Sequence, residues 1–152
     1  INKGNATLLD VAGVWIREHG GGHVRIMSWS NTGFPIPTRI IPWLEENATG
    51  SVTLAVRRGI MKLQRDAIAR IQARYGPRSV RLVETHAETV MVGDNVLLGS
   101  TPTMSTGMLE WHRVGPVPAL AEWFDSLPVA PLVHRDEKKQ MSLDEILRGW
   151  NA

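Results

Sequence analysis

Apolar residues along the chain follow two periods, one typical of helices and one typical of strands. Between residues 7 and 16 they recur at helical spacing, and the glycines at 20–22 end the pattern. The same spacing, bounded by proline or glycine, predicts further helices over 34–47, 60–75 and 119–127. The segment 60–75 has the clearest helical pattern of the four.

Short apolar and β-branched segments lie between these helices and predict strands. They cover residues 24–30, 51–56, 80–83, 88–92, 96–98 and 108–114. Gly93-Asp94-Asn95 is a tight-turn signal between two of them. Helices and strands alternate through the first half of the chain, and strands cluster afterwards. This order predicts a single α/β domain whose mixed β-sheet is flanked by helices.

Composition narrows the class of protein. The chain has 152 residues, of which 43% are apolar and 21% charged, which fits one folded domain and argues against disorder. It has no cysteine, which excludes thiol catalysis and cysteine-ligated zinc and fits a reducing cytosol. The histidines lack metal-ligand spacing, so we expect neither a metal nor a cofactor. We also expect a cytoplasmic protein without a membrane segment, because no run of 18 apolar residues occurs.

The most specific motif lies in residues 85–100. His86 is followed by an apolar strand and then by Gly99-Ser100. This arrangement resembles the signature of the phospholipase D superfamily, H-x-K-x4-D followed by an apolar strand and G-S-x-N. The resemblance covers residues 7–127 as a phospholipase D-like domain and leaves 128–152 as a tail with a short amphipathic helix. The chain is most similar to the small bacterial endonucleases with one motif per chain, which work as homodimers.

The resemblance implies a metal-independent phosphodiesterase site. His86 falls on the histidine that attacks phosphorus and forms a covalent intermediate. Ser100 falls on the serine that donates a hydrogen bond to the phosphate oxygens. Glu110 matches an acidic residue on a following strand, and a carboxylate behind the histidine sets its tautomer. The other interpretation of His86 is a hydrogen-bonded structural histidine.

Three positions depart from the family pattern. Glu88 replaces the lysine that neutralises the phosphate, while Gly93 and Pro102 replace the aspartate and the asparagine. At about 4 Å and an effective dielectric near 20, the repulsion between Glu88 and a phosphate is roughly 4 kcal/mol. We therefore expect ordinary phosphodiesterase activity to be lost.

Positive charge is concentrated between residues 57 and 81. This stretch has eight basic residues and one acidic residue, Asp66, a local balance of +7. Such a segment is typical of phosphate-backbone binding, although a solvated helix face explains it equally well. The candidate nucleic-acid-binding residues are Arg57, Arg58, Lys62, Arg65, Arg70 and Arg74.

These observations lead to three hypotheses. The first is a nucleic-acid-binding homodimer, with DNA favoured over RNA, on a phospholipase D-like domain without normal catalysis. The second is an active metal-independent nuclease that uses His86 as its nucleophile. The third is a structural or partner-binding protein of a phage or mobile-element assembly.

Overall fold

Three parallel strands form one half of the central sheet. They are β2 (Val24–Met27), β3 (Val52–Val56) and β4 (Val80–Leu82). Every residue in them is buried, as is typical of parallel strands covered on both faces, where β-branched side chains pack well. The computed structural model describes residues 2–3, 8–27, 36–84, 89–99, 108–109 and 111–133.

The other half of the sheet is antiparallel. β5 (Thr89–Val92) pairs with β2, and β6 (Asn95–Gly99) and β8 (Trp111–Pro116) follow. The strand order of this six-stranded sheet is β4-β3-β2-β5-β6-β8. Gly93 and Asp94 connect β5 to β6, and Gly93 has a φ of +59°, which residues with a Cβ atom rarely adopt. The predicted tight turn is confirmed.

A second, two-stranded sheet joins two short segments that are far apart in the sequence. β1 (Asn2–Lys3) pairs antiparallel with β7 (Met108–Leu109). The strand predicted over 108–114 is therefore divided between β7 in this sheet and β8 in the central one.

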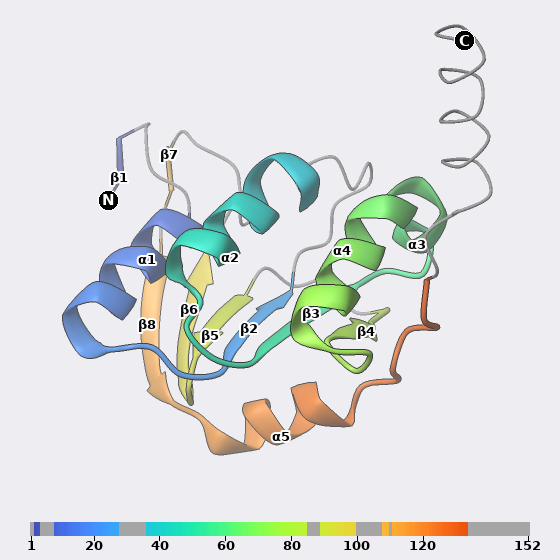
Figure 1. Cartoon of the computed structure of the whole chain (residues 1–152). Coiled ribbons are helices and arrows are strands. Elements are labelled where there is room, and N and C mark those ends of the chain that lie inside the picture. Colours follow the sequence, from blue (N-terminus) through green and yellow to red (C-terminus); the bar gives the residue numbers. More distant parts are fainter. Residues whose placement is uncertain are drawn as a thin grey trace, which may run out of the picture.

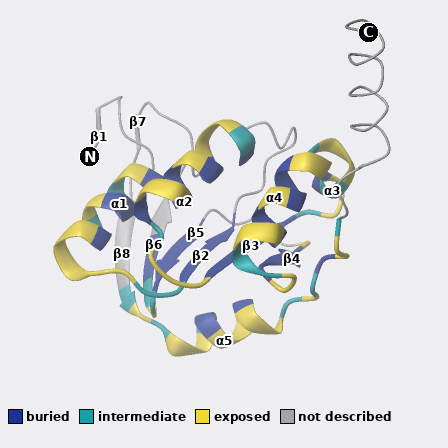
Figure 2. Ribbon diagram, viewed as in Figure 1, coloured by how far each residue is buried: buried dark blue, intermediate teal, exposed yellow. Residues whose placement is uncertain are grey.

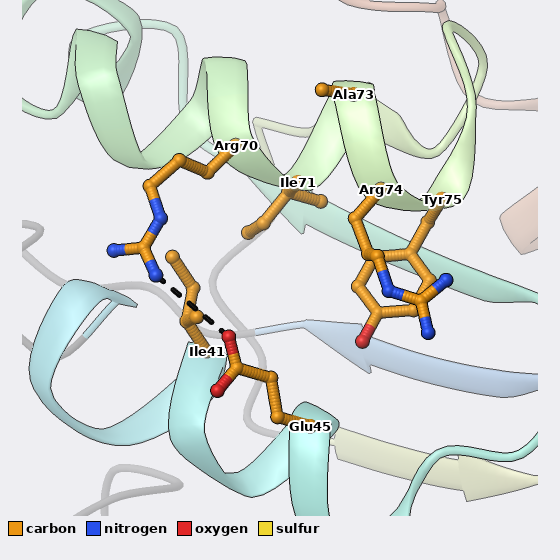
Figure 3. A pocket seen from close by; sticks show the side chains of 7 residues that line it. All are labelled: Ile41, Glu45, Arg70, Ile71, Ala73, Arg74 and Tyr75. Atoms are coloured by element: carbon orange, nitrogen blue, oxygen red, sulfur yellow. Dashed lines mark ion pairs between the residues drawn. The ribbon is translucent and has the colours of Figure 1, made fainter.

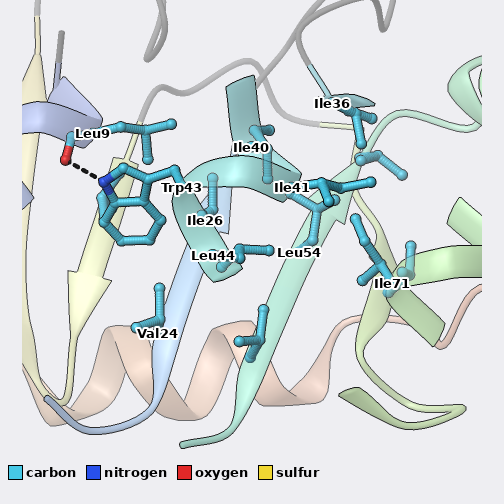
Figure 4. Close-up of a cluster of buried hydrophobic side chains, with 14 of the residues drawn as sticks. Leu9, Val24, Ile26, Ile36, Ile40, Ile41, Trp43, Leu44, Leu54 and Ile71 are labelled. Carbon is cyan, nitrogen blue, oxygen red and sulfur yellow. Dashed lines mark hydrogen bonds between the residues drawn. The ribbon is translucent and has the colours of Figure 1, made fainter. Parts of the chain in front are cut away.

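Helices cover one face of the central sheet (Figure 1). They are α1 (Leu8–His19), η1 (Ile36–Ile40), α2 (Ile41–Asn47), α3 (Ile60–Leu63) and α4 (Arg65–Tyr75). Their apolar side chains meet Val24, Ile26 and Leu54 of the strands in one large buried cluster (Figure 4). Within it, the indole Nε1 of Trp43 donates a 2.7 Å hydrogen bond to the carbonyl oxygen of Leu9, which joins α2 to α1.

α5 (Pro118–Ser126) covers the opposite face of the sheet (Figure 1). Phe124 has an exposed fraction of 0% and packs with Ala121, Met27, Ala55 and Met91 in a second cluster. The domain therefore has three layers, and its exposed residues lie on the outer sides of the helices and in the loops (Figure 2). The predicted α/β domain with a mixed sheet flanked by helices is confirmed.

The continuous helix predicted over 60–75 is wrong. Gln64 separates α3 from α4 with φ −126° and ψ 44°, outside the helical region. Ile60 and Ile68 on either side of the break are both buried, whereas Leu63 is 57% exposed. A continuous helix predicts Leu63 on the buried face, so the change of direction at Gln64 accounts for the difference.

The apolar face of α5 also differs from the prediction. Helical spacing places Leu120, Trp123, Phe124 and Leu127 on one buried face. Trp123 is instead 39% exposed, and the small Ala121 lies beside Phe124 in the buried cluster. The buried face of α5 is therefore formed by a small side chain together with a large one.

Residues 128–130 cover the outer edge of β4. The amide of Leu82 donates a hydrogen bond to the carbonyl oxygen of Pro128 at 2.8 Å. The amide of Ala130 donates one to the carbonyl oxygen of Val80 at 2.9 Å, and the side chain of Ala130 is buried. These contacts give the edge strand main-chain partners on its outer side.

Gln72 of α4 holds the next residues of the chain. Its Nε2 donates a 3.0 Å hydrogen bond to the carbonyl oxygen of Pro131, and its Oε1 accepts one of 2.8 Å from the amide of Val133. Gln72 is only 2% exposed, so both ends of its amide need protein partners. The chain thus stays packed against α4 as far as Val133. The short amphipathic helix predicted for the tail lies outside the described residues.

Candidate nucleic-acid interface

Several strands end or begin at one edge of the central sheet. β2, β3 and β4 are parallel, so their carboxyl ends lie at the same edge. β6 ends there too, because Met27 at the end of β2 pairs with Thr89, and Thr89 pairs with Leu98. Trp111 at the start of β8 pairs with Gly99. The described strand ends that flank residues 85–88 and residue 100 therefore lie along this carboxyl edge.

The motif residues themselves lie outside the described part of the chain. These are His86, Glu88, Ser100 and Glu110. The resemblance predicts that they form one site, and this stays a prediction. Binding sites of open α/β sheets usually lie beyond the carboxyl ends of the strands.

The basic segment starts at the same edge. Arg57 and Arg58 directly follow Val56, the last residue of β3. The side chain of Arg58 is exposed, that of Arg57 is partly buried, and that of Lys62 on α3 is exposed. Two of the six candidate nucleic-acid-binding residues are thus in the turn that leaves the carboxyl edge.

The other three candidates lie on α4, with Arg65 on one side of the helix and Arg70 and Arg74 on the side that faces α2. Arg65, Arg70 and Arg74 are exposed, whereas Ile68 and Ile71 on the same helix are buried. At 1.5 Å per residue, the backbone positions of Arg65 and Arg74 are about 14 Å apart along the helix axis. The i, i+3 spacing of Lys62 and Arg65 would place them on one face of a continuous helix, but the break at Gln64 separates them. The positive charge is therefore spread over more than one side of α3 and α4.

Two of these arginines line a pocket of about 430 Å³ between α2 and α4 (Figure 3). Its apolar lining comes from Ile41 on α2 and from Ile71 and Ala73 on α4. Glu45, Arg70, Arg74 and Tyr75 complete the lining.

Arg70 and Glu45 extend toward each other from facing helices (Figure 3). Their nearest charged atoms are 3.7 Å apart, and their side chains are 47% and 63% exposed. An exposed ion pair of this kind stabilises a fold by about 1 kcal/mol or less. The guanidinium carbon of Arg74 lies 5.3 Å from the ring centre of Tyr75, a cation–π contact. Burial raises the pKa of the Tyr75 phenol above 10.0, so this group keeps its proton at neutral pH.

A charged cluster beneath α5 was not predicted from the sequence. Arg25 of β2 donates from Nε and Nη2 to the two carboxylate oxygens of Asp125, at 3.0 and 2.8 Å. Its Nη1 also donates to the carbonyl oxygen of Gly93 at 3.2 Å. The side chain of Arg25 is 8% exposed and that of Asp125 is 45% exposed. The hydrogen bond from Arg25 holds the pKa of Asp125 below its ordinary value.

A second arginine ties α5 to the sheet. Arg81 of β4 donates from Nη1 to the carbonyl oxygens of Asp125 and Leu127, at 2.5 and 2.9 Å. These acceptors lie at the C-terminal end of α5, where main-chain carbonyls lack partners within the helix and carry partial negative charge. Arg25 and Arg81 together therefore fix the end of α5 against the sheet.

His23 lies beside this cluster. One of its ring nitrogens, Nε2, is 2.7 Å from the hydroxyl oxygen of Thr53. Burial, and next the positive charge of Arg25, lower the pKa of His23 below 6.5. Asp125 has the opposite but smaller effect, so His23 is neutral in the folded protein at neutral pH.

The lowered pKa of His23 predicts a loss of stability in mild acid. The unfolded chain takes up a proton at His23 near pH 6.5, while the folded protein does so only at lower pH. The contribution of His23 is therefore complete above pH 6.5 and is lost as the pH falls through its folded-state pKa. Asp125, whose folded-state pKa is also lowered, adds a separate loss that begins near pH 3.8.

Urea unfolding of the wild type and of His23→Gln over a pH series measures this effect. We expect the free energy of unfolding of the variant to fall less steeply below pH 6.5 than that of the wild type. The fall that Asp125 causes at lower pH should remain. Parallel curves for the two proteins would show that His23 does not contribute.

Two further findings concern only the described residues. No group of three or more histidine, aspartate or glutamate side chains in this part of the chain is arranged to hold a metal ion. None of its helices has the length and apolar character needed to cross a membrane.

The chain was also compared with known proteins. No family model, no curated protein and no solved structure matches it.

Proposed function

We propose that this chain binds nucleic acid through the phosphate backbone, DNA in preference to RNA, on a phospholipase D-like domain without ordinary phosphodiesterase activity. The observation that carries the proposal is the series of exposed basic side chains from the carboxyl edge along α3 and α4. Arg58, Lys62 and Arg65 are exposed members of this series and have no ion-pair partner among the described residues. Phosphate contacts of this kind supply most of the affinity in sequence-independent binding.

The charge of this surface is poorly compensated. Asp66 is the one acidic residue between residues 57 and 81. Glu45 on α2 approaches Arg70, but the 3.7 Å distance is longer than a good hydrogen bond. The surface therefore keeps a positive potential that attracts a polyanion and that salt screens.

The strand arrangement supports the phospholipase D-like part of the proposal. The strand ends that flank the motif lie along the carboxyl edge, beside the turn that holds Arg57 and Arg58. A motif at that edge would lie next to the start of the basic surface. With Glu88 in the position of the family lysine, the combination favours holding a phosphate backbone over cleaving it.

A fluorescence-anisotropy titration with labelled DNA over a salt series tests the proposal. We expect the logarithm of the binding constant to fall linearly with the logarithm of salt concentration. Replacing Arg58, Lys62 and Arg65 by alanine, singly, is expected to reduce the slope by about one for each phosphate that is no longer neutralised. Arg17→Ala, which removes an exposed arginine from α1, is the matched control. No binding at low salt, or a slope near zero, would contradict the proposal.

The second candidate is a metal-independent phosphodiesterase with His86 as nucleophile. The observation in its favour is that the strand ends on either side of the motif segments share one edge, as a composite site requires. Incubation with DNA in the presence of EDTA separates the two candidates. Cleavage that disappears in His86→Ala would establish the enzyme, and equal behaviour of both proteins would remove it. Light scattering of the same samples measures whether the protein is the homodimer that the resemblance implies.

A further inference from the structure

The pocket between α2 and α4 combines an apolar floor with opposite charges at its rim. Ile41 and Ile71 are 6% and 1% exposed and form the floor. Arg70, Arg74 and Glu45 stand around it, with a net charge of +1. A ligand that complements these groups has a flat, largely apolar body, an anionic group and a hydrogen-bond donor. A nucleotide has all three.

We infer that this pocket holds one nucleotide, with its base on the floor of Ile41 and Ile71 and its phosphate between Arg70 and Arg74. The inference rests on the proposed function and deepens it, because it names single-stranded nucleic acid as the bound class. A base inside a duplex is stacked and paired, so only an unpaired nucleotide can enter.

The phosphate end of the site is built on one helix. Arg70 and Arg74 are four residues apart, so their side chains are neighbours on the surface of α4. Arg74 is oriented by its contact with the ring of Tyr75. Among the described residues, the ion-pair partner of Arg70 is Glu45 at 3.7 Å, and a phosphate that accepts two hydrogen bonds is a stronger partner for a guanidinium. Figure 3 shows the two guanidinium groups on opposite sides of the pocket, so a phosphate that uses both must draw these exposed side chains together.

The base end of the site is formed by both helices. Ile41 and Ile71 are almost fully buried at the bottom of the pocket. The base therefore lies over them and against the Tyr75 ring and the aliphatic parts of Arg70 and Arg74. Once the phosphate takes Arg70, the carboxylate of Glu45 can accept a hydrogen bond from an N–H on the base edge. The protonated Tyr75 phenol adds a donor or acceptor. The volume of about 430 Å³ falls within the range of roughly 300–1,000 Å³ for small-molecule sites.

Titration of isotope-labelled full-length protein with adenosine 5′-monophosphate, followed by NMR, tests the inference. We expect saturable shifts that are largest for the amides of α2 and α4. Adenosine and inorganic phosphate are each expected to bind at least about tenfold more weakly, since each engages only one half of the site. The absence of saturable shifts, or phosphate binding as tight as that of the nucleotide, would overturn the inference.

Two variants distinguish binding in the pocket from attraction to the general positive charge of the surface. Tyr75→Ala removes the aromatic ring from the pocket lining and keeps every charge. Arg74→Ala keeps the space and removes one cation. Both are expected to weaken nucleotide binding by about tenfold or more, while Arg17→Ala leaves it unchanged. Thermal unfolding checks that the variants are folded, and wild-type affinity in both pocket variants would overturn the inference.

A labelled single-stranded oligonucleotide completes the experiment. We expect Tyr75→Ala to weaken its binding and the mononucleotide to compete with it. Oligonucleotide binding that depends on salt, without any mononucleotide binding, would overturn the pocket and leave the proposed function standing. Mononucleotide binding without oligonucleotide binding would contradict the proposed function. It would also contradict single-stranded nucleic acid as the bound class.

Discussion

Replacing Phe124 by alanine is expected to lower the free energy of unfolding by about 3–5 kcal/mol. The Phe124 side chain is fully buried and packs with Met27, Ala55 and Met91 on the face of the sheet that α5 covers. Truncation removes the transfer energy of the ring and leaves a cavity, because the neighbouring strands are fixed by their own hydrogen bonds. No other described aromatic side chain is buried to this extent in the second cluster.

Trp123→Ala is the matched control for this prediction. Trp123 is the preceding residue on α5 and is larger, but it is 39% exposed, and its ring meets that of Phe124 edge to face at 6.0 Å. We expect its removal to cost about 1 kcal/mol or less. Guanidinium unfolding followed by circular dichroism measures both variants. A larger effect at Trp123 than at Phe124 would mean that α5 packs on the sheet through a different face.

The second large effect is expected at Asp125. The stability lost should depend on which partner of the Arg25–Asp125 ion pair is replaced. Asp125→Ala leaves the guanidinium of Arg25, 8% exposed, with Gly93 as its remaining described hydrogen-bond acceptor. Breaking a buried ion pair from one side costs about 3–5 kcal/mol, and we expect the lower end because Asp125 itself is 45% exposed. Arg25→Met removes the buried charge, keeps apolar contacts, and leaves a carboxylate that water can solvate. Its cost should therefore be smaller, near 1 kcal/mol.

The double variant Arg25→Met/Asp125→Ala isolates the interaction. We expect it to be more stable than Asp125→Ala alone, because it no longer buries an unpaired charge. Chemical unfolding of the wild type, both single variants and the double variant gives the coupling energy. Equal losses for the two single variants, or strictly additive ones, would contradict a buried pair whose cost depends on which side is broken.

Much of the fold follows from the sequence because proline, glycine and turn residues mark the ends of many helices and strands. The strands β3, β4, β5 and β6 lie within a residue or two of their predicted ranges. The misses come from tertiary contacts. Gln64 interrupts a pattern that looks continuous, and Leu63 beside the interruption is exposed although Ile60 and Ile68 are buried. Spacing along a helix contains no information about where its axis changes direction.

Arg25 shows a related limit. A charged residue within a short apolar strand reads as a solvent-facing position, yet both faces of β2 are buried. Its partner, Asp125, is 100 residues away in the sequence, and only the packing of α5 brings them together.

The candidate site also has a part that the sequence predicts and a part that depends on tertiary packing. The exposed basic residues of α3 and α4 were recognisable from composition, since no apolar stripe includes them. The pocket was not, because Glu45 and Arg70 come from different helices and meet only through the packing of α2 beside α4. His86, Glu88, Ser100 and Glu110 rest on the resemblance alone.

The closure of β4 by residues 128–130 has a consequence for assembly. A sheet with two open edges can add copies of itself without end, as in a fibre. Here one edge is occupied through the hydrogen bonds of Leu82 and Ala130, whereas no described strand pairs with the outer side of β8. Association of copies through their sheet edges would therefore stop at two, with β8 against β8, which makes any such contact a self-limiting one.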